Sequence, residues 1–306
     1  MPSDAIEDLH YLTCPRPEGG PRVSIIMPTF RRSSQIGESI CSLLDGEYQD
    51  FELLVRDDGD GTDGTQAAVV AAGAGDNRLR YHLNAANLGI ARNLNAGILE
   101  SRGEFISVCH DHDLYRVGFL KAMVAALDRN PSALYVHCAS DLVMQDGTTV
   151  ARSEIQDFSE LTAGREWLRF MLSTPHCPVC ALTLVRRVAH EHCGLYNPAY
   201  GFITDIDMWM RLSANGDVAY VREPHLLLRE REEDHQAIRN WAEITQNLFR
   251  IHVRHIPHAY GGWRRFQAHI RLRHWRNRNL VVGAARSIKR FIPFSVQKDP
   301  SLRGAH

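Results

Sequence analysis

Short apolar runs alternate with helical patterns through the first hundred residues, and this alternation constrains the fold more than any other feature. The apolar runs are Val23–Met27, Phe51–Val55, Leu79–Leu83 and Phe105–Cys109. Apolar residues at helical spacing follow the first three of them, in Ser33–Leu44, Thr65–Ala72 and Asn87–Leu99. Strands that alternate with helices form parallel sheets with right-handed crossovers. We therefore expect an α/β fold with a mostly parallel sheet, in which Pro28 ends the first strand.

The pattern continues less regularly beyond residue 115. It predicts helices at Val117–Leu127, Arg165–Leu172 and Ile206–Ser213, and strands at Ala133–Cys138 and Ala181–Val185. Asp146-Gly147 is a candidate turn between short strands, and Asn215-Gly216 suits a helix C-terminal cap. From Ile238 onward the pattern is mainly helical.

Composition is that of an ordinary globular protein. The 306 residues are 44% apolar and 23% charged, which allows a sizeable core in one large domain with appendages or in two modest domains. The acidic N-terminal residues carry no apolar export signal, and no stretch approaches the ~20 apolar residues that span a bilayer. The seven scattered cysteines then favour reduced, mostly buried thiols in a cytoplasmic protein.

Charge is distributed unevenly. The segment Ile244–Lys298 has twelve Lys/Arg and no Asp/Glu, so the rest of a chain with net charge −1 carries −13. A helix that mixes basic and aromatic residues can lie on an anionic membrane surface. Packing of this tail on the acidic remainder is the alternative, and no nucleic-acid partner is expected although such charge would suit one. We expect a cytoplasmic protein, with the inner face of the membrane as a candidate place of attachment.

A cluster of four polar residues, His110-Asp111-His112-Asp113, follows the fourth apolar run. The carboxyl ends of strands are where open α/β sheets bind ligands. Neighbouring carboxylates repel each other until a divalent cation binds, so the cluster points to metal-assisted chemistry on a phosphorylated substrate. Asp57-Asp58-Gly59, which follows the second run at the same edge, could accept hydrogen bonds from a nucleoside. Solvated turns are the alternative for both segments.

Other nucleotide-binding motifs are absent from the sequence. No Gly-x-Gly-x-x-Gly follows the first apolar run, so a dinucleotide-binding fold is not supported. No Walker A sequence occurs either.

Several short segments stand in a characteristic order, namely Val23–Phe30, Asp57–Gly59, Asn87–Gly89, Asn95–Gly97, Gly103–Ile106 and the 110–113 cluster. Together they resemble the family 2 inverting glycosyltransferases with the GT-A fold, over roughly residues 20–230. The resemblance implies a Rossmann-like sheet flanked by helices. It also implies a division into an N-terminal tail (1–20), a nucleotide-sugar-binding half (21–115), an acceptor-binding half (116–235) and a helical basic C-terminal extension (236–306).

The resemblance assigns two sets of binding residues. Those expected at the nucleotide-diphosphate sugar donor are Pro28, Thr29, Phe30, Asp57, Asp58, Asn87, Asn95 and Asp111. Those expected to hold Mn²⁺ or Mg²⁺ against the diphosphate are Asp111, His112 and Asp113. The family commonly has aspartates where this chain has His110 and His112, and imidazole favours Mn²⁺. Two arrangements stay open: either His112 is the principal ligand, or an aspartate binds the metal while the histidines orient phosphate or sugar.

The segment Thr204–Arg211 resembles the family's Glu-Asp-x-Asp-x-Trp-x-Arg sequence, with Thr204 in place of the glutamate. The resemblance makes Asp205 the general base that takes the acceptor hydroxyl's proton. The alternative is a carboxylate that merely stabilises a helix N-terminus. Trp209 is expected in the core, and Arg211 is expected to pair with a carboxylate or a phosphate.

Two other groups of residues are weaker candidates. Arg229 and His235 lie where the family has residues near the donor phosphates, but their charged neighbours favour a solvated surface run. The set His176, Cys177, Cys180, His190, His192 and Cys193 contains zinc-ligand types at unusual spacing, so buried thiols are favoured over a zinc site.

The expected function is metal-dependent, inverting transfer of a sugar to a hydroxyl of a glycan, a glycolipid (a lipid-linked acceptor) or a secondary metabolite. One alternative is a sugar-1-phosphate nucleotidyltransferase, although the segment after the first run lacks the glycines of such enzymes. The other alternative is a non-catalytic nucleotide-sugar-binding protein on the same fold.

Overall fold

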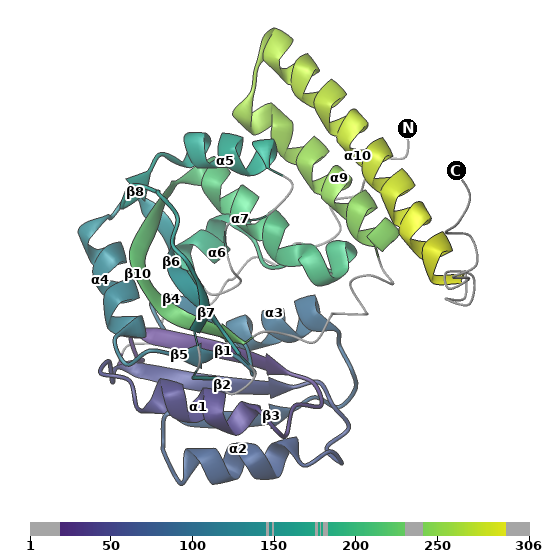
Figure 1. Cartoon of the computed structure of the whole chain (residues 1–306). Coiled ribbons are helices and arrows are strands. Elements are labelled where there is room, and N and C mark those ends of the chain that lie inside the picture. Colours follow the sequence, from purple (N-terminus) through teal and green to yellow (C-terminus); the bar gives the residue numbers. More distant parts are fainter. Residues whose placement is uncertain are drawn as a thin grey trace, which may run out of the picture. The chain divides into compact units, whose positions relative to one another are not determined.

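The computed structural model describes residues 19–144, 147–148, 150–174, 177, 179, 183–229 and 241–291. Contacts divide the chain into two units, Met1–Glu233 and Asp234–His306. The first unit has one central sheet with strand order β3-β2-β1-β4-β9-β6-β10-β5, flanked by helices (Figure 1). The strands are β1 (Val23–Thr29), β2 (Phe51–Asp57), β3 (Leu79–Leu83), β4 (Phe105–Val108), β5 (Leu114–Tyr115), β6 (Ala133–Val143), β7 (Val150–Glu154), β8 (Leu161–Thr162), β9 (Thr183–Arg186) and β10 (Asp217–Arg229). The helices are α1 (Ile36–Leu44), α2 (Thr65–Gly73), α3 (Ile90–Glu100), α4 (Phe119–Arg129), α5 (Gly164–Ser173), α6 (Arg187–Cys193), the 3₁₀ segment η1 (Pro198–Ile203) and α7 (Thr204–Asn215).

The sheet is parallel in its first half and mixed in its second. β1 pairs in parallel with β2 and β4, and β2 with β3, which confirms the α/β fold class. β9 runs antiparallel to both β4 and β6, and β5, β7 and β8 are also antiparallel to their partners. The apolar patterns could not reveal this change, because a strand buried on both faces has the same pattern in either direction.

The first strand is longer than its sequence predicts. The prediction that Pro28 ends it is wrong, since β1 continues to Thr29. Backbone groups of successive strand residues point to alternate neighbours, and the carbonyl of Ile26 accepts from the Cys109 N–H on the β4 side. Pro28 therefore points to that side as well, where β4 has already ended at Val108. Its missing N–H removes no hydrogen bond of the sheet.

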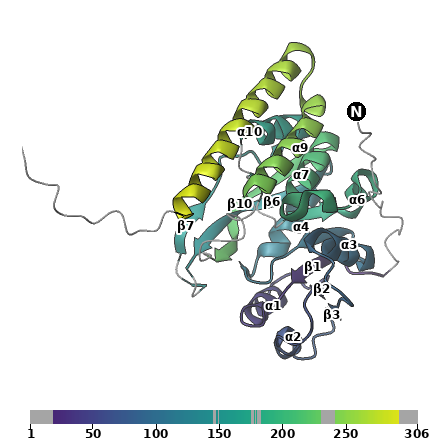
Figure 2. The same cartoon turned by 90° about the vertical axis from the view of Figure 1, so that its right-hand side faces the viewer.

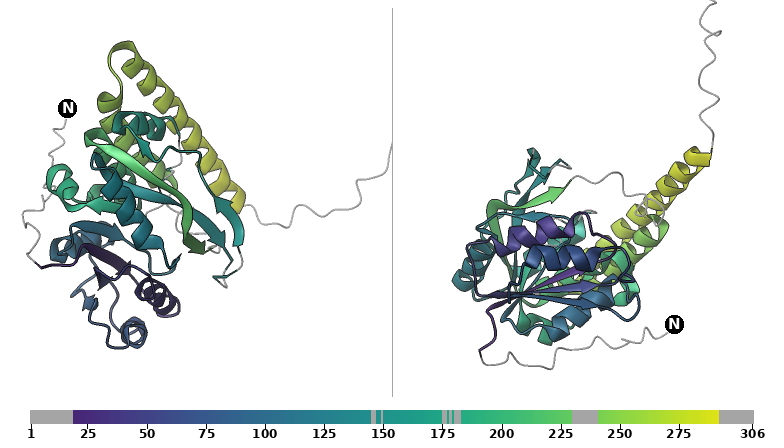
Figure 3. Two further views of the ribbon diagram at one scale, coloured as in Figure 1. Left: turned by 90° about the vertical axis from the view of Figure 1, so that its left-hand side faces the viewer. Right: turned by 90° about the horizontal axis from the view of Figure 1, so that it is seen from below.

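The two faces of the sheet are covered by different helices. α1, α2 and α4 share one apolar core with alternate residues of β1, such as Ile25 and Met27. Figure 3 shows α1 and α2 side by side below the sheet. α3 covers the opposite face, where a side chain on Gly97 would place its Cβ 2.5 Å from Ile26 Cγ2. This close packing fixes α3 against β1 and β2.

A predicted turn and a predicted helix end both fall at glycines. The turn at Asp146-Gly147 falls between the antiparallel β6 and β7, although Asp146 lies outside the described residues. α7 ends at Asn215 as predicted, but Gly216 is extended, with a φ of −169°, and not left-handed. Glycine is required there because a Cβ would lie 2.4 Å from Leu134 Cγ.

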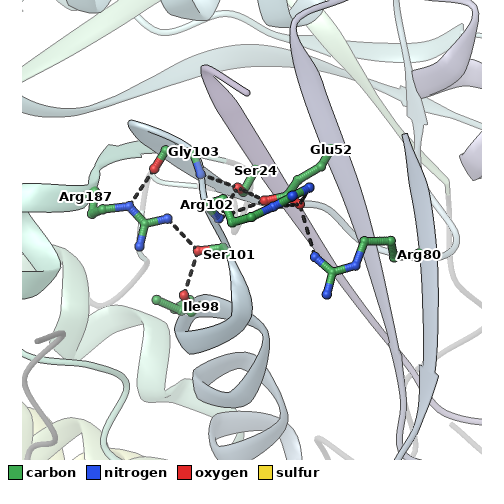
Figure 4. A network of polar contacts seen from close by, with 8 residues as sticks. All are labelled: Ser24, Glu52, Arg80, Ile98, Ser101, Arg102, Gly103 and Arg187. Carbon is green, nitrogen blue, oxygen red and sulfur yellow. Dashed lines mark hydrogen bonds and ion pairs between the residues drawn. The ribbon is translucent and has the colours of Figure 1, made fainter. Parts of the chain in front are cut away.

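A buried polar network joins the amino ends of β1, β2 and β4 (Figure 4). Glu52 accepts from the Ser24 hydroxyl at 2.7 Å and from the Arg102 backbone N–H at 2.7 Å, and the Gly103 N–H donates to Ser24 Oγ at 2.7 Å. Burial alone would raise the pKa of Glu52, but the hydrogen bonds from Arg102 and Ser24 hold it below its usual value. The network sets the relative positions of three strands whose opposite ends carry the candidate site.

We expect Gly103→Ala to destabilise the first unit by about 2–3 kcal/mol, because the new Cβ overpacks this junction. It would lie 2.5 Å from the Ser24 nitrogen and 2.7 Å from the Val23 carbonyl carbon, which are backbone atoms of β1. Urea unfolding measures the change. The control is Gly37→Ala in α1, whose Cβ meets nothing closer than 3.9 Å and which should be neutral or stabilising. Equal effects at the two glycines would contradict the packing argument.

The second unit is a pair of helices, α9 (Trp241–Ala259) and α10 (Gly262–Phe291), which run alongside each other (Figure 2). Ile251 and Ile256 of α9 and Leu272 of α10 are buried, and the Trp241 indole donates to the Asn279 carbonyl at 3.0 Å. The helical character expected for 236–306 is thus found in 241–291, and the rest of that range lies outside the described residues. None of the helices in the described part combines the length and apolar composition needed to cross a bilayer.

Candidate active site

The predicted polar cluster lies at the carboxyl edge of the sheet, directly after β4. The ring of His110 contacts Asp113 (Nδ1–Oδ2 2.9 Å), and the ring of His112 contacts Asp111 (Nδ1–Oδ1 2.9 Å). The two imidazoles stack, with centroids 5.2 Å apart and planes inclined by 12°. The four residues therefore form two interleaved His–Asp pairs rather than a solvated turn.

Neighbouring elements hold this cluster in place. The Arg229 backbone N–H, at the end of β10, donates to Asp113 Oδ1 at 3.2 Å, and the Tyr115 hydroxyl donates to the His110 carbonyl at 3.0 Å. Burial alone would raise the pKa of Asp113, but the hydrogen bond from His110 and the charges of both histidines keep it below its usual value. The lowered pKa favours the ionised form of Asp113 in the cluster.

The sequence favours a solvated position for Arg229, and this prediction is wrong. The Arg229 side chain is buried and pairs with Glu38 of α1. Arg229 is the last residue of β10, and its backbone N–H contacts Asp113, so the strand places this residue beside the cluster. His235 lies outside the described residues.

The chemistry of the cluster suits a metal ion. Ligand atoms of His110, His112 and Asp113 all lie within 4.8 Å of one another, and the second ring nitrogen of His112, Nε2, is 3.8 Å from Asp113 Oδ1. Two imidazole nitrogens and one carboxylate are a usual set for a first-row divalent metal. The metal-ligand set expected from the sequence has Asp111 in place of His110. In the structure the Asp111 carboxylate instead contacts Nδ1 of His112, while Nε2 of the same ring faces Asp113.

Asp205 occupies the first turn of α7, after a kinked segment in which Gly201 has a φ of 56°. Burial raises the pKa of Asp205 to about 6, against opposing effects of the Ile206 backbone N–H and of the His110 charge. The charge of His110 acts on Asp205, so the two sequence-distant candidates lie within electrostatic reach of each other. A carboxyl group with a pKa near neutrality is suited to general-base chemistry.

The remaining residues of the 204–211 segment are structural. Trp209 is fully buried, as expected, and Thr204 donates to the Asn197 carbonyl at 2.9 Å. Arg211 pairs with Asp207 at 2.8 Å, which confirms the expected carboxylate partner. Arg211 also donates to the Leu195 carbonyl at 2.7 Å, so it fastens α7 to the loop before it.

Asp58, expected at the donor, organises the loop before α3. Its carboxylate accepts from the backbone N–H groups of Leu88 at 2.7 Å and Gly89 at 2.8 Å, and from the Asn84 amide at 2.9 Å. This is why α3 begins at Ile90 and not at Asn87, as the sequence predicts. Asn87 in turn donates to the Asp58 carbonyl at 3.0 Å.

Asp57 and Asn95 have internal partners on both polar atoms. Asp57, which is fully buried, accepts from the Gly59 N–H and from the Tyr81 hydroxyl, each at 2.8 Å. Asn95 exchanges hydrogen bonds of 2.8 and 2.9 Å with the backbone of Tyr196. A contact of these side chains with a donor stays a prediction, and their described role is to shape the edge.

The end of β1 presents a different kind of surface. Phe30 is 51% exposed beside Arg31, which has a left-handed φ of 56° and pairs with Asp60. Thr29 is buried, and its hydroxyl has no hydrogen-bond partner among the described residues. The exposed ring of Phe30 and the unpartnered hydroxyl of Thr29 are features that suit the binding of a ligand.

No second metal cluster is found in the part of the chain that the structure describes. Among the zinc candidates, His176 and Cys180 lie outside it, and His192 Nδ1 contacts the Val188 carbonyl at 2.7 Å. His190 is buried, and burial lowers its pKa to about 3. Of the five cysteines described, Cys109, Cys138 and Cys193 are buried and Cys41 is exposed.

Comparison with known proteins decides the family. The model of "Glycosyl transferase family 2" matches residues 24–194, more than half of the chain. The chain belongs to glycosyl transferase family 2. The match begins in β1 and takes in the cluster after β4. The enzyme is accordingly a glycosyltransferase.

Curated relatives agree with this membership. A protein of Haemophilus influenzae described as an uncharacterized glycosyltransferase is 24% identical over 228 residues, which are 72% of this chain and 68% of the relative. The GalNAc(5)-diNAcBac-PP-undecaprenol beta-1,3-glucosyltransferase of Campylobacter jejuni is 29% identical over 119 residues. That match covers 39% of this chain and only 38% of the Campylobacter enzyme.

Solved structures show the same fold. TarS 1–349 of S. aureus, in complex with UDP-GlcNAc, has a TM-score of 0.63 at 18% identity, over 82% of this chain and 71% of TarS. The mannosyltransferase PcManGT of Pyrobaculum calidifontis, in complex with GDP-Man and Mn²⁺, has a TM-score of 0.58 at 18% identity. The match covers 91% of this chain and 78% of PcManGT. The GT-A architecture expected for this glycosyltransferase is thereby confirmed.

Sequence reasoning missed several residues that build the site. Asn84 links Asp58 to Arg56 and Asn93 through buried side-chain bonds of 2.6 to 2.9 Å. His110 was not among the expected metal ligands, although its spacing of two from His112 was a usable signal. The backbone contact of Arg229 with Asp113 leaves no signal in the sequence.

Proposed function

We propose that this glycosyltransferase transfers a sugar from a nucleotide-diphosphate sugar to an acceptor hydroxyl, with a divalent cation and with inversion at the anomeric carbon. The observation that carries the proposal is the cluster of His110, His112 and Asp113 at the carboxyl edge of the sheet, whose ligand atoms all lie within 4.8 Å of one another. The Asp205 carboxyl, with a pKa raised to about 6, lies within electrostatic reach of His110. Direct displacement of the nucleoside diphosphate needs a base for the acceptor hydroxyl and a group that binds the leaving diphosphate.

Asp205 is the proposed general base. Inversion requires a carboxylate opposite the leaving group, which takes the acceptor hydroxyl's proton as that oxygen attacks. Above a pH of about 6 Asp205 is ionised, and its pKa is close enough to neutrality for efficient proton transfer. The rate should therefore fall as the pH drops below the pKa.

The proposed metal ligands are His110, His112 and Asp113, the set that the geometry brings together. A cation held there would neutralise charge on the leaving diphosphate, and a nitrogen-rich set favours Mn²⁺ over Mg²⁺. Asp111 orients His112 through Nδ1, as outer carboxylates commonly do for metal-bound histidines. This assignment replaces Asp111 by His110 in the expected set and keeps Asp111 as a positioning residue.

The donor is proposed to lie along the carboxyl edge of β1 and β2. Phe30 offers an aromatic ring and Thr29 a hydroxyl without a partner in the described chain, while Asp58 and Asn87 fix the facing loop. These observations support residues 21–115 as the donor-binding half, and we propose residues 116–235 as the acceptor-binding half. Complexes of TarS with UDP-GlcNAc and of PcManGT with GDP-Man are consistent with a donor of this class.

The acceptor is proposed to be a carbohydrate on a lipid carrier, as in polysaccharide biosynthesis at the cytoplasmic face of a membrane. The name of the Campylobacter relative specifies such an acceptor, an undecaprenol-diphosphate-linked glycan. The family match favours sugar transfer over the nucleotidyltransferase considered from sequence. A non-catalytic binding protein on the same fold would show no turnover, so turnover that Asp205→Asn abolishes would exclude it.

A thermal-shift panel tests the donor and metal assignments together. We expect one nucleoside-diphosphate sugar, at about a hundred times its Kd, to raise the Tm by about 5 °C with Mn²⁺ present, and much less with EDTA. Nucleosides without the diphosphate serve as the control, since they cannot bridge to the cation. Absence of a Mn²⁺-dependent shift with every donor in the panel would overturn the proposed metal dependence.

A further inference from the structure

An apolar strip of three side chains lies along the outer face of α10. Trp263, Phe266 and Ile270 are 68%, 51% and 41% exposed. At about 100° per residue, positions 263, 266 and 270 fall within an arc of roughly 60° on the helix. Large aromatic side chains are normally buried, so a contiguous exposed strip of them marks a binding surface.

The strip is not part of the packing of the second unit. The described side chains of α10 that are buried or half-buried are Ala268, His269, Leu272, Trp275, Arg276, Asn279 and Leu280. On the helix they centre roughly 140° away from the strip, by the same geometry. Trp275 stacks with His252 of α9, and Asn279 accepts from Trp241. α9 therefore covers one side of α10 and leaves the strip facing outward.

Arginines flank the strip on both sides. Arg271 and Arg278 fall on one side of it and Arg273 on the other, and all three are exposed. The sequence of α10 contains nine Lys/Arg and no Asp/Glu. A helix with an apolar strip, aromatic residues and a basic border has the composition of one that lies in the interface of an anionic bilayer.

We propose that this strip and its arginines are a docking surface for an anionic phospholipid membrane. Charge complementarity selects this occupant. Nucleic acid would use the arginines but would leave the apolar strip in water. A second copy paired through the same strip would set arginines against arginines with no acidic residue of α10 to compensate. Docking stands independently of the proposed reaction, but it would bring the enzyme to a surface where lipid-linked acceptors reside.

Vesicle flotation of the full-length protein tests the proposal. We expect binding to vesicles of phosphatidylcholine with about 30% phosphatidylglycerol at about 0.1 M salt, none to phosphatidylcholine alone, and release as salt is raised. The double variant Trp263→Ser, Phe266→Ser should bind at least about tenfold more weakly. The matched control is Val70→Ser in α2, at a position 65% exposed, which should bind like the wild type.

A second measurement separates docking from loss of folding. Brominated lipids should quench the fluorescence of the wild-type protein, and Trp263→Phe should remove most of this quenching while binding is retained. Activity of both variants on a water-soluble acceptor should be unchanged, so failure of docking and failure of catalysis are distinguishable. Equal binding by the double variant, no binding to anionic vesicles, or a solution dimer that the double variant turns into a monomer would each overturn the proposal.

Discussion

Asp205→Asn should lower kcat by about a thousandfold and at the same time make the folded protein more stable at about pH 8. The loss of rate follows from removal of the proposed base, because an amide cannot take a proton from the acceptor. The gain in stability follows from the same burial that raises the pKa of the Asp205 carboxyl to about 6. Both changes are measured on one protein, by turnover and by thermal unfolding.

The raised pKa of Asp205 sets the sign of the stability change. The folded value of about 6 lies above the ordinary 3.8, so folding favours the neutral acid. As the pH rises from 3.8 to 6, the unfolded chain loses this proton first and the folded state loses stability. Above that range the cost reaches at most about 3 kcal/mol, which asparagine does not incur. The gain in Tm should therefore be largest at about pH 8 and roughly half as large at about pH 5.

Asp207→Asn is the matched control, two residues further along α7. Asp207 is fully buried against Arg211, so its replacement should lower the Tm and should not mimic the specific loss of kcat. A wild-type rate in Asp205→Asn would remove Asp205 as the base. A fall in Tm for Asp205→Asn at about pH 8 would contradict the raised pKa.

Much of the fold could be predicted because its elements carry local signals. The runs at Val23, Phe51, Leu79 and Phe105 each begin a strand at the predicted residue. The wrong predictions concern positions whose structure depends on a residue or strand elsewhere in the chain. Pro28 is tolerated because β4 has already ended, and α3 starts three residues late because Asp58 takes the N–H groups before it. The direction of β9 depends on pairing with β4 and β6, which its own four residues do not encode.

The candidate site likewise has residues that the sequence predicts and geometry that it does not. Asp205 and the 110–113 cluster are recognisable as motifs, and the structure brings them within electrostatic reach of each other. Which cluster member binds a metal is a question of side-chain geometry, and there the stacked rings of His110 and His112 change the expected set. The burial of Arg229 is likewise decided by β10, although its charged sequence neighbours favour the surface.

His112→Ala should abolish Mn²⁺-dependent stabilisation by the donor and lower kcat/KM by roughly two to three orders of magnitude, because it removes one of the three proposed ligands of the cation. His112→Asp should restore part of the activity and shift the preference from Mn²⁺ toward Mg²⁺, since it exchanges nitrogen for oxygen. Titration of Mn²⁺ by calorimetry, together with rates in each metal, measures both effects.

The matched pair Asp113→Asn and Asp111→Asn distinguishes the ligand set that the geometry favours from the set expected by resemblance. The Asp113 carboxylate belongs to the same group of candidate ligand atoms as the two imidazoles. Within the cluster, Asp111 contacts His112, through Nδ1 at 2.9 Å. An asparagine oxygen at 111 still accepts that hydrogen bond, so Asp111→Asn should weaken Mn²⁺ binding by about tenfold or less. Asp113→Asn removes an ionised ligand and should weaken it far more. Equal losses in the two variants would return Asp111 to the metal and leave His110 as an orienting group.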